Sequence, residues 1–151
     1  MPGCLVADAE LTVDDLKGRS SFERLHIRAR TTIPGNVRRA SRLHPARLYL
    51  FDLLAIGADV QTMTDVRELA LKERKARLRD SFGDTQAMIF VSGIVDAGEW
   101  VFQQAVEHDL EGMIAKRLDR PYQRGRTRDW LKIKHAGYSR PAALGFGKTA
   151  G

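Results

Sequence analysis

Short apolar runs alternate with longer charged segments along this chain, and the spacing of the apolar positions predicts both strands and helices. Apolar runs rich in β-branched and aromatic residues predict strands at residues 6–13, 47–54, 87–91, 111–116 and 130–134. Apolar positions three or four residues apart predict helices at residues 66–82 and 96–110, and a shorter helix starts near residue 20. Residues 28–46 are expected to form a loop and one short helix, because prolines and a glycine interrupt them. This order of elements is typical of an α+β domain with largely antiparallel sheets.

Two of the predicted strands carry acidic side chains. In the strand at residues 6–13, Asp8, Glu10 and Thr12 share one face, which indicates an edge strand with one side in water. The run at residues 47–54 is apolar apart from Asp52 and a basic first residue, which is typical of a buried strand. In such a strand Phe51 would be an ordinary core residue.

Lys132 and Lys134 alternate with apolar residues in the strand predicted at residues 130–134. Because side chains at i and i+2 point to the same face of a strand, the two ammonium groups would point together while Leu131 and Ile133 pack behind them. Two aligned ammonium groups suit a polyphosphate. The same pair also fits the solvent face of an edge strand, where lysines discourage strand-to-strand aggregation.

The segment that leads to these lysines is strongly basic. Residues 116–134 contain eight basic residues and two acidic ones, and the stretch 121–126 combines arginines with proline and glycine. This composition predicts a loop near phosphates, and a solvated charged loop is the alternative.

The overall composition adds a bias in charge. A formal charge of +6 and a pI near 9.8 favour an acidic partner such as DNA, and 43% apolar residues in 151 can build a core. The one cysteine, Cys4, excludes an internal disulfide, and the four histidines lack the spacing of metal ligands. We expect no membrane segment and a cytoplasmic location, because the N-terminus lacks a signal-peptide pattern and Asp52 interrupts the longest apolar run.

Several segments together resemble one enzyme family. E-G-M-I-A-K at residues 111–116, P-Y-Q-R-G-R at 121–126 and W-L-K-I-K at 130–134 resemble nucleotidyltransferase motifs IV and V of ATP-dependent DNA ligases, most of all the bacterial end-joining type. Y-L-F-D-L-L at residues 49–54 resembles motif III of that family, and D-A-E-L-T at 8–12 resembles its D-G-E-L-V element, with Ala9 in place of glycine. R-S-S-F-E-R-L at residues 19–25 is similar to a helix start in end-joining ligases, where Ser20 or Ser21 can cap the helix.

The resemblance implies a fold and a set of roles. The fold is a nucleotidyltransferase (ATP-grasp-like) adenylation domain, α+β with antiparallel sheets and flanking helices, incomplete at its N-terminus. Glu111 and Glu10 would bind the metal, Mg²⁺ or Mn²⁺, with Glu10 also near the ribose. Lys132 and Lys134 would hold the phosphates of ATP, and Phe51 would stack on the adenine. The partners implied are nicked or broken duplex DNA and other end-joining repair proteins or domains.

One family element does not occur in the sequence. The family reaction begins at the lysine of K-x-D-G, which forms a lysyl-AMP adduct, and no such tetrapeptide occurs among the 151 residues. Lys17 is the nearest candidate, but it follows the D-x-E strand, whereas the family nucleophile precedes it. We therefore expect this chain alone to form no lysyl-AMP. We assign residues 1–134 to a partial adenylation domain and 135–151 to a loose tail, without an oligonucleotide-binding barrel.

The function implied is that of an ATP-dependent DNA ligase fragment, whose family seals strand breaks through lysyl-AMP and DNA-adenylate in repair and recombination. Two alternatives stay open. One is a non-catalytic DNA- or nucleotide-binding remnant of a ligase. The other is an RNA ligase or capping nucleotidyltransferase, which shares the general carboxylate and lysine pattern.

Overall fold

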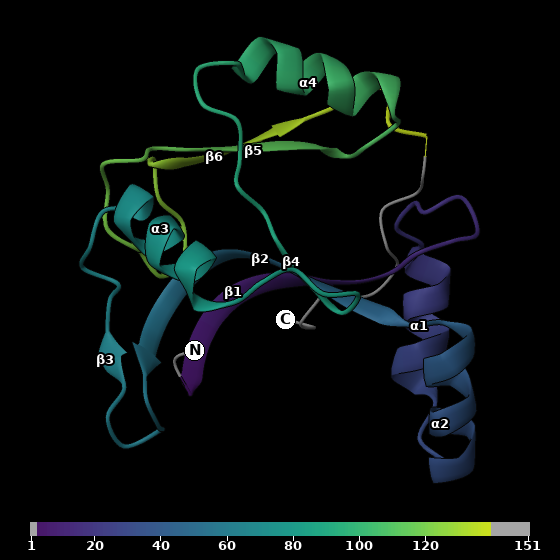
Figure 1. Ribbon diagram of the computed structural model, residues 1–151. Coiled ribbons are helices and arrows are strands. Elements are labelled where there is room, and N and C mark those ends of the chain that lie inside the picture. The colour runs from purple at the N-terminus through teal and green to yellow at the C-terminus, as the bar shows by residue number, and fades with distance from the viewer. Residues whose placement is uncertain (1–2, 140–151) are drawn as a thin grey trace, which may run out of the picture. The chain divides into compact units, whose positions relative to one another are not determined.

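The computed structural model describes residues 3–139, which fall into two compact units (Figure 1). Of the described residues, 3–92 and 118–122 form the larger unit, and 93–117 and 123–139 form the smaller one. Both units combine helices with sheets whose strands are mostly antiparallel, so the predicted fold class is confirmed. None of the helices in residues 3–139 is long and apolar enough to span a bilayer.

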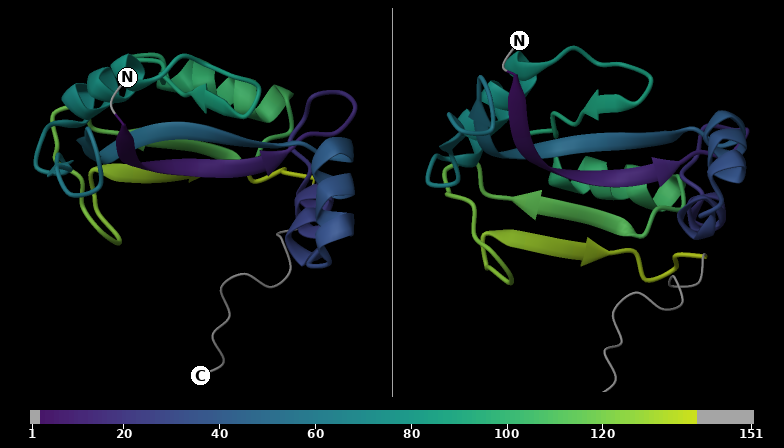
Figure 2. Two further views of the ribbon diagram at one scale, coloured as in Figure 1. Left: turned by 60° about the horizontal axis from the view of Figure 1, so that its bottom comes forward. Right: turned by 90° about the horizontal axis from the view of Figure 1, so that it is seen from below.

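The larger unit is built on a long pair of antiparallel strands, β1 (Cys4–Val13) and β2 (Ala46–Gly57). The two-residue strand β3 (Thr64–Asp65) continues the sheet antiparallel to β2, and β4 (Met88–Phe90) pairs with β2 in parallel (Figure 2). Only β3 has no counterpart among the predicted strands, because two exposed residues carry no apolar alternation. The parallel pair departs from the antiparallel pattern that the sequence predicts.

The register between β1 and β2 shifts twice. Asp8 lies opposite Asp52 and Ala9 lies opposite Leu50, so Phe51 is the extra residue of β2 at the second shift. Such an extra residue is a β-bulge, which bends the strand and redirects its side chain. Phe51 is half-buried at this bulge.

The prediction that one whole face of β1 lies in water is wrong at its end. Asp8 is half-buried and Glu10 is exposed, but Thr12 is only 8% exposed. The reason is tertiary, because helix α1 (Phe22–Arg30) packs against the end of β1 and covers it. The alternation therefore predicts correctly that Asp8, Glu10 and Thr12 share one face of β1, but it does not predict how exposed each side chain is.

Helix α3 (Leu71–Ser81) covers β2 and completes the core of the larger unit. Leu50, Leu53, Val66 and Leu78 form the buried cluster, with Phe82 and other half-buried apolar residues around it. The helix is shorter than the predicted range 66–82. It starts at Leu71 because the carbonyls of Leu118 and Arg120 accept the first amide hydrogens, and Ala70 offers no side-chain cap.

An ion pair lies at the centre of this core. Arg74 on α3 and Asp52 on β2 are both 0% exposed. Arg74 donates from Nε to Oδ1 at 2.7 Å and from Nη2 to Oδ2 at 2.9 Å, while the amide of Leu53 donates to the same carboxylate at 2.9 Å. Nη1 of Arg74 donates to the carbonyls of Leu69 and Arg120. The pair therefore has hydrogen-bond partners on both sides, as a buried pair of charges requires.

Helices α1 and α2 (Pro34–Leu43) lie side by side at one end of the β1–β2 pair (Figures 1 and 2). The hydroxyl of Ser21 accepts the amide of Arg24 at 3.4 Å, which confirms the predicted cap. Helix α2 is the short helix predicted within residues 28–46, and it fills ten of them. Pro34 begins the helix instead of breaking it, because a proline in the first turn needs no amide donor and has a helical φ.

The smaller unit consists of helix α4 (Gly98–Glu107) packed on the hairpin of β5 (Gly112–Lys116) and β6 (Trp130–Lys134). Ala105 is the buried residue of α4, and the helix is shorter than the predicted range 96–110. Residues 135–139 continue from β6, and both the amide and the hydroxyl of Ser139 donate to Asp109. The remainder of the predicted tail, 140–151, lies outside the described residues.

Candidate functional site

The hairpin of the smaller unit brings three of the predicted site residues together. Lys132 and Lys134 lie on the same face of β6, and Glu111 immediately precedes β5. Nζ of Lys132 lies 2.7 Å from Oε1 of Glu111, and Nζ of Lys134 lies 3.9 Å from the same oxygen. Both predicted phosphate ligands therefore converge on the predicted metal ligand.

Gly112 makes this arrangement possible. Its φ of +144° is unfavourable for any residue with a side chain. A Cβ at this position would lie 2.0 Å from the carbonyl oxygen of Ile133 and 2.9 Å from Cα of Lys134. The close approach lets the amide of His135 donate to the carbonyl of Glu111 at 2.8 Å, which fixes the acid beside the end of β6. The sequence signal for this role was the glycine that directly follows the acid.

The first prediction concerns this glycine. Gly112→Ala should lower the free energy of unfolding by about 1–3 kcal/mol from the strained φ alone. The clash of the methyl group with the backbone of β6 should increase this loss. Chemical denaturation followed by circular dichroism measures the loss. Gly83→Ala is the control, since a Cβ there meets nothing within 4 Å. An unfolding midpoint of Gly112→Ala equal to that of the control contradicts the proposed role of Gly112.

The charges of the cluster remain in contact with water. Glu111, Lys132 and Lys134 have side chains 53%, 52% and 69% exposed. The hydrogen bond from Lys132, and then the charges of Lys132 and Lys134, lower the pKa of Glu111. Exposed ion pairs contribute little to stability, typically about 0–1 kcal/mol. Glu111, Lys132 and Lys134 can therefore give up their ion pairs for contacts with a ligand, with little loss in the free energy of unfolding.

The same face of the hairpin continues beyond the lysines. Ile114 is 59% exposed directly across from Lys132. At the far end, Nζ of Lys116 lies 4.0 Å from the ring centroid of Trp130, its partner across the ladder. The face therefore presents an apolar residue between cationic groups.

The other two predicted site residues lie in the larger unit. Glu10 is exposed on β1 opposite Tyr49, and Phe51 is half-buried at the bulge of β2. The prediction that Phe51 and Glu10 share one nucleotide site with Glu111, Lys132 and Lys134 stays a prediction.

Comparison with known proteins decides the family. The family model described as "ATP dependent DNA ligase domain" matches residues 3–134. The chain belongs to this family of ATP-dependent DNA ligase domains. The match contains every segment on which the resemblance rests, from D-A-E-L-T to W-L-K-I-K.

Curated relatives agree with this assignment. The chain is 31% identical over 129 residues to the multifunctional non-homologous end joining protein LigD of Pseudomonas aeruginosa, covering 84% of this chain and 14% of that protein. It is 27% identical over 106 residues to a probable DNA ligase of Dictyoglomus turgidum, covering 67% of this chain and 17% of that protein. The chain thus spans less than a fifth of the length of these relatives.

Solved structures confirm the fold. A mycobacterial DNA ligase D complexed with ATP and MES matches with a TM-score of 0.65 at 26% identity, covering 87% of this chain and 38% of that one. The ligase domain of M. tuberculosis LigD matches with a TM-score of 0.63 at 27% identity over the same shares. The predicted nucleotidyltransferase fold of a ligase domain is confirmed.

Within this ligase domain, Tyr122 is a residue that sequence reasoning treated only as part of a basic loop. Its hydroxyl donates to Oδ2 of Asp8 at 2.7 Å, and its amide donates to the carbonyl of Arg67. The guanidinium of Arg74 lies 5.8 Å from its ring centroid. The hydrogen bond to Asp8, with partial burial and the charge of that acid, raises the pKa of Tyr122 to about 12. Tyr122 is therefore a neutral anchor that holds residues 118–122 on β1 within the larger unit.

The described residues contain no preformed cluster of metal ligands. Among residues 3–139, no group of three or more His, Cys, Asp or Glu side chains could hold a metal ion.

Proposed function

We propose that this chain is part of the adenylation domain of an ATP-dependent DNA ligase of the bacterial end-joining type. The observation that carries the proposal is the convergence of Lys132 and Lys134 on Glu111 within a region that matches the ligase family. The reaction of the whole protein would be the sealing of breaks in duplex DNA during repair and recombination, in the cytoplasm. The end-joining function named for the Pseudomonas relative supports the proposal that other end-joining proteins or domains are partners.

The chemistry of the cluster supports phosphoryl transfer. Sealing is an in-line displacement at phosphorus, in which negative charge is spread over the non-bridging oxygens. Two ammonium groups on one strand face can neutralise such oxygens and hold the phosphate in line. Glu111 keeps both lysines oriented until a phosphate takes its place.

The residues fit a hard divalent cation. Glu111 presents a half-exposed carboxylate with a lowered pKa, so it is ionised at neutral pH and reachable from water. Glu10 is a second exposed carboxylate. Mg²⁺ binds proteins through one or two carboxylates while retaining water and phosphate ligands, and when bound it would add positive charge on the phosphate oxygens. Glu111 and Glu10 are the residues that we propose to hold it.

Phe51 would supply the base contact. A flat aromatic face stacks on a purine ring, and the bulge of β2 leaves the ring half-buried instead of enclosed in the core. Lys132 and Lys134 would bind the phosphates of the same ATP.

The second prediction tests sealing without the missing lysine nucleophile. A nicked duplex whose 5′-phosphate already carries AMP needs only attack by the 3′-hydroxyl, which forms the phosphodiester bond and releases AMP. With Mg²⁺ and no ATP, the 151-residue chain should seal this nick in a single turnover. Glu111→Gln should slow sealing about 10²-fold, by analogy with the loss of other metal-site residues. Gel separation of the ligated strand measures the rate.

Glu99→Gln is the matched control, because Glu99 is an exposed acid on α4 of the same unit. It should seal at the wild-type rate. Binding of the nicked duplex without any sealing contradicts the ligase proposal and favours the non-catalytic remnant. Equal rates for Glu111→Gln and Glu99→Gln contradict the role of Glu111.

A further inference from the structure

Helices α1 and α2 with their flanks form a second strongly basic segment, besides residues 116–134. Residues 19–47 contain one acid, Glu23, and eight arginines, so their formal charge of +7 exceeds the +6 of the whole chain. We call these residues the arginine hairpin. Its arginines are Arg19, Arg24, Arg28, Arg30, Arg38, Arg39, Arg42 and Arg47.

Some of these arginines hold the hairpin to the sheet. Arg24 donates to the carbonyl of Asp14 at 3.1 Å, and Arg47 lies 2.8 Å from the Asp14 carboxylate. Arg28 donates to the carbonyl of His44 at 3.1 Å, which joins α1 to the end of α2. These side chains have a structural function.

The arginines of α2 have no such function. Arg38, Arg39 and Arg42 are exposed, and none of the acids in residues 3–139 pairs with them. Arg38 and Arg42 are four residues apart, so they are neighbours on one face of the helix and repel each other. Neither α1 nor α2 has a buried residue that would make these charges useful for packing. The repulsion is small at an exposed site, typically about 0.2–0.5 kcal/mol for such a pair, and an anionic partner would relieve it.

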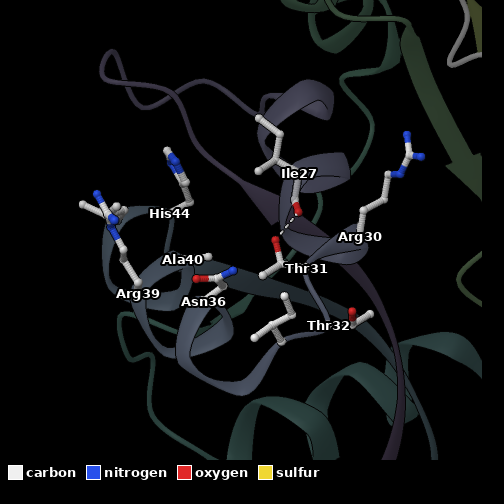
Figure 3. Close-up of a pocket in the computed structure, with 10 residues that line it drawn as sticks. Ile27, Arg30, Thr31, Thr32, Asn36, Arg39, Ala40 and His44 are labelled. Atoms are coloured by element: carbon white, nitrogen blue, oxygen red, sulfur yellow. Dashed lines mark hydrogen bonds between the residues drawn. The ribbon is translucent and has the colours of Figure 1, made fainter.

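The groove between the two helices has the donors that such a partner needs. A pocket of about 510 Å³ lies between α1 and α2, with Arg30 and Arg39 on opposite sides of it (Figure 3). Thr31, Thr32 and Asn36 add hydroxyl and amide groups to its lining. Arginine, threonine and asparagine side chains are typical contacts of DNA phosphates, which carry no sequence information.

The hairpin is not built to bind single strands. Proteins that bind single-stranded nucleic acid stack bases on exposed aromatic rings. Phe22 is the one phenylalanine, tyrosine or tryptophan in residues 19–47; it is 44% exposed, and its ring centroid lies 5.9 Å from that of His26. Three exposed arginines on α2, beside one aromatic ring already packed near a histidine, fit the backbone of a duplex better than a row of unstacked bases.

We propose that the arginine hairpin grips the phosphate backbone of duplex DNA, independently of sequence and apart from the phosphate-binding lysines of β6. The inference rests on the proposed function, which makes DNA the partner. It assigns to α1 and α2 the task of holding the duplex, whereas Lys132 and Lys134 act on the reacting phosphate.

The third prediction tests this surface with Arg38→Gln/Arg39→Gln. Glutamine is nearly as good a helix former as arginine, and the variant removes the repulsion with Arg42, so the melting temperature should not fall. Binding to an intact 25-base-pair duplex, measured by fluorescence anisotropy between 50 and 200 mM salt, should weaken. The slope of log K against log salt should decrease in magnitude by about 2, one unit for each lost phosphate contact.

Lys72→Gln/Arg77→Gln is the matched control, because it removes two exposed cations from α3. It should bind duplex with nearly the wild-type slope, and equal losses in the two variants contradict the proposal. Vesicles of phosphatidylcholine and phosphatidylserine form a second arm. If Arg38→Gln/Arg39→Gln loses vesicle binding but keeps duplex binding, the proposal that the arginine hairpin binds duplex DNA is also contradicted.

The experiment separates this inference from the ligase proposal. Intact duplex has no nick to seal. Weaker duplex binding by Arg38→Gln/Arg39→Gln therefore supports DNA binding by the arginine hairpin even if the pre-adenylated nick is not sealed. Suppose instead that the chain seals the pre-adenylated nick and that Arg38→Gln/Arg39→Gln binds intact duplex as tightly as the wild type does. The proposed role of the arginine hairpin is then wrong, and the ligase proposal is unaffected.

Discussion

Arg74→Met is expected to lower the free energy of unfolding by about 3–5 kcal/mol, the largest effect on stability of any substitution considered in this chain. Arg74 and Asp52 are 0% exposed, so the variant leaves a carboxylate buried with the Leu53 amide as its remaining donor. The carbonyls of Leu69 and Arg120 lose a donor as well. Urea denaturation followed by circular dichroism measures the loss.

Arg67→Met is the control that separates burial from pairing. Arg67 also pairs with an aspartate, Asp65, at 2.6 Å, but the two side chains are 51% and 54% exposed. The exposed pair should contribute at most about 1 kcal/mol, because water solvates the carboxylate that remains. Equal losses for Arg67→Met and Arg74→Met contradict the importance of burial.

Asp52→Asn/Arg74→Met tests the cause of the loss. Asparagine is neutral, and its oxygen still accepts from the Leu53 amide. The double variant should therefore recover more than half of the stability lost in Arg74→Met, because it removes the unpaired buried charge. A double variant no more stable than Arg74→Met shows that lost packing, and not the charge, accounts for the effect.

The burial of Arg74 is not visible in the sequence. Asp52 is recognisable as the one acid of an apolar strand, and its structural role follows from that. Arg74 lies among many charged residues of a helix and is indistinguishable in sequence from Arg77, which is exposed. Its burial depends on a partner 22 positions earlier in the chain and on carbonyls from residue 120, so no local pattern reveals it.

The strands were easier to predict than the helices, for a physical reason. Alternating positions in β1 and β6, and short apolar runs in β2 and β5, locate these strands to within a few residues, because they carry β-branched and aromatic residues between turns. Helix α2 has no buried face, so its apolar positions carry little information. The bulge at Phe51 follows from the pairing of two strands and is not a property of either sequence alone.

The candidate site was predictable in part. The period of two placed Lys132 and Lys134 on one face of a strand, as the structure confirms. The expectation that Leu131 and Ile133 pack behind them is wrong, because Leu131 is 56% and Ile133 36% exposed and α4 covers mainly β5. The ion pair between Lys132 and Glu111 depends on the register of β5 and β6. That register requires a glycine at position 112, where the two backbones approach too closely for a side chain. Register is a tertiary property that a single strand does not encode.

Lys132→Gln/Lys134→Gln is expected to weaken binding of ATP with Mg²⁺ about 10²-fold or more. A hydrogen bond to a charged group contributes about 1.5–3 kcal/mol, and each lysine is proposed to make one with the phosphates. The lower end of that range applies, because the side chains are 52% and 69% exposed. Two such losses together correspond to about two orders of magnitude in the dissociation constant.

The same double variant should leave the fold unchanged, since the exposed pairs with Glu111 contribute at most about 1 kcal/mol. Isothermal titration calorimetry with ATP and Mg²⁺ gives the affinity, and urea denaturation of the same sample gives the stability. Lys72→Gln/Arg77→Gln removes equal charge from α3 and should bind ATP like the wild type. If both double variants lose affinity equally, the lysines act through net charge and the assignment of β6 as the phosphate-binding strand is wrong. If Lys132→Gln/Lys134→Gln loses ATP affinity and also unfolds, while Lys72→Gln/Arg77→Gln does neither, the two lysines stabilise the β5–β6 hairpin and do not bind the nucleotide.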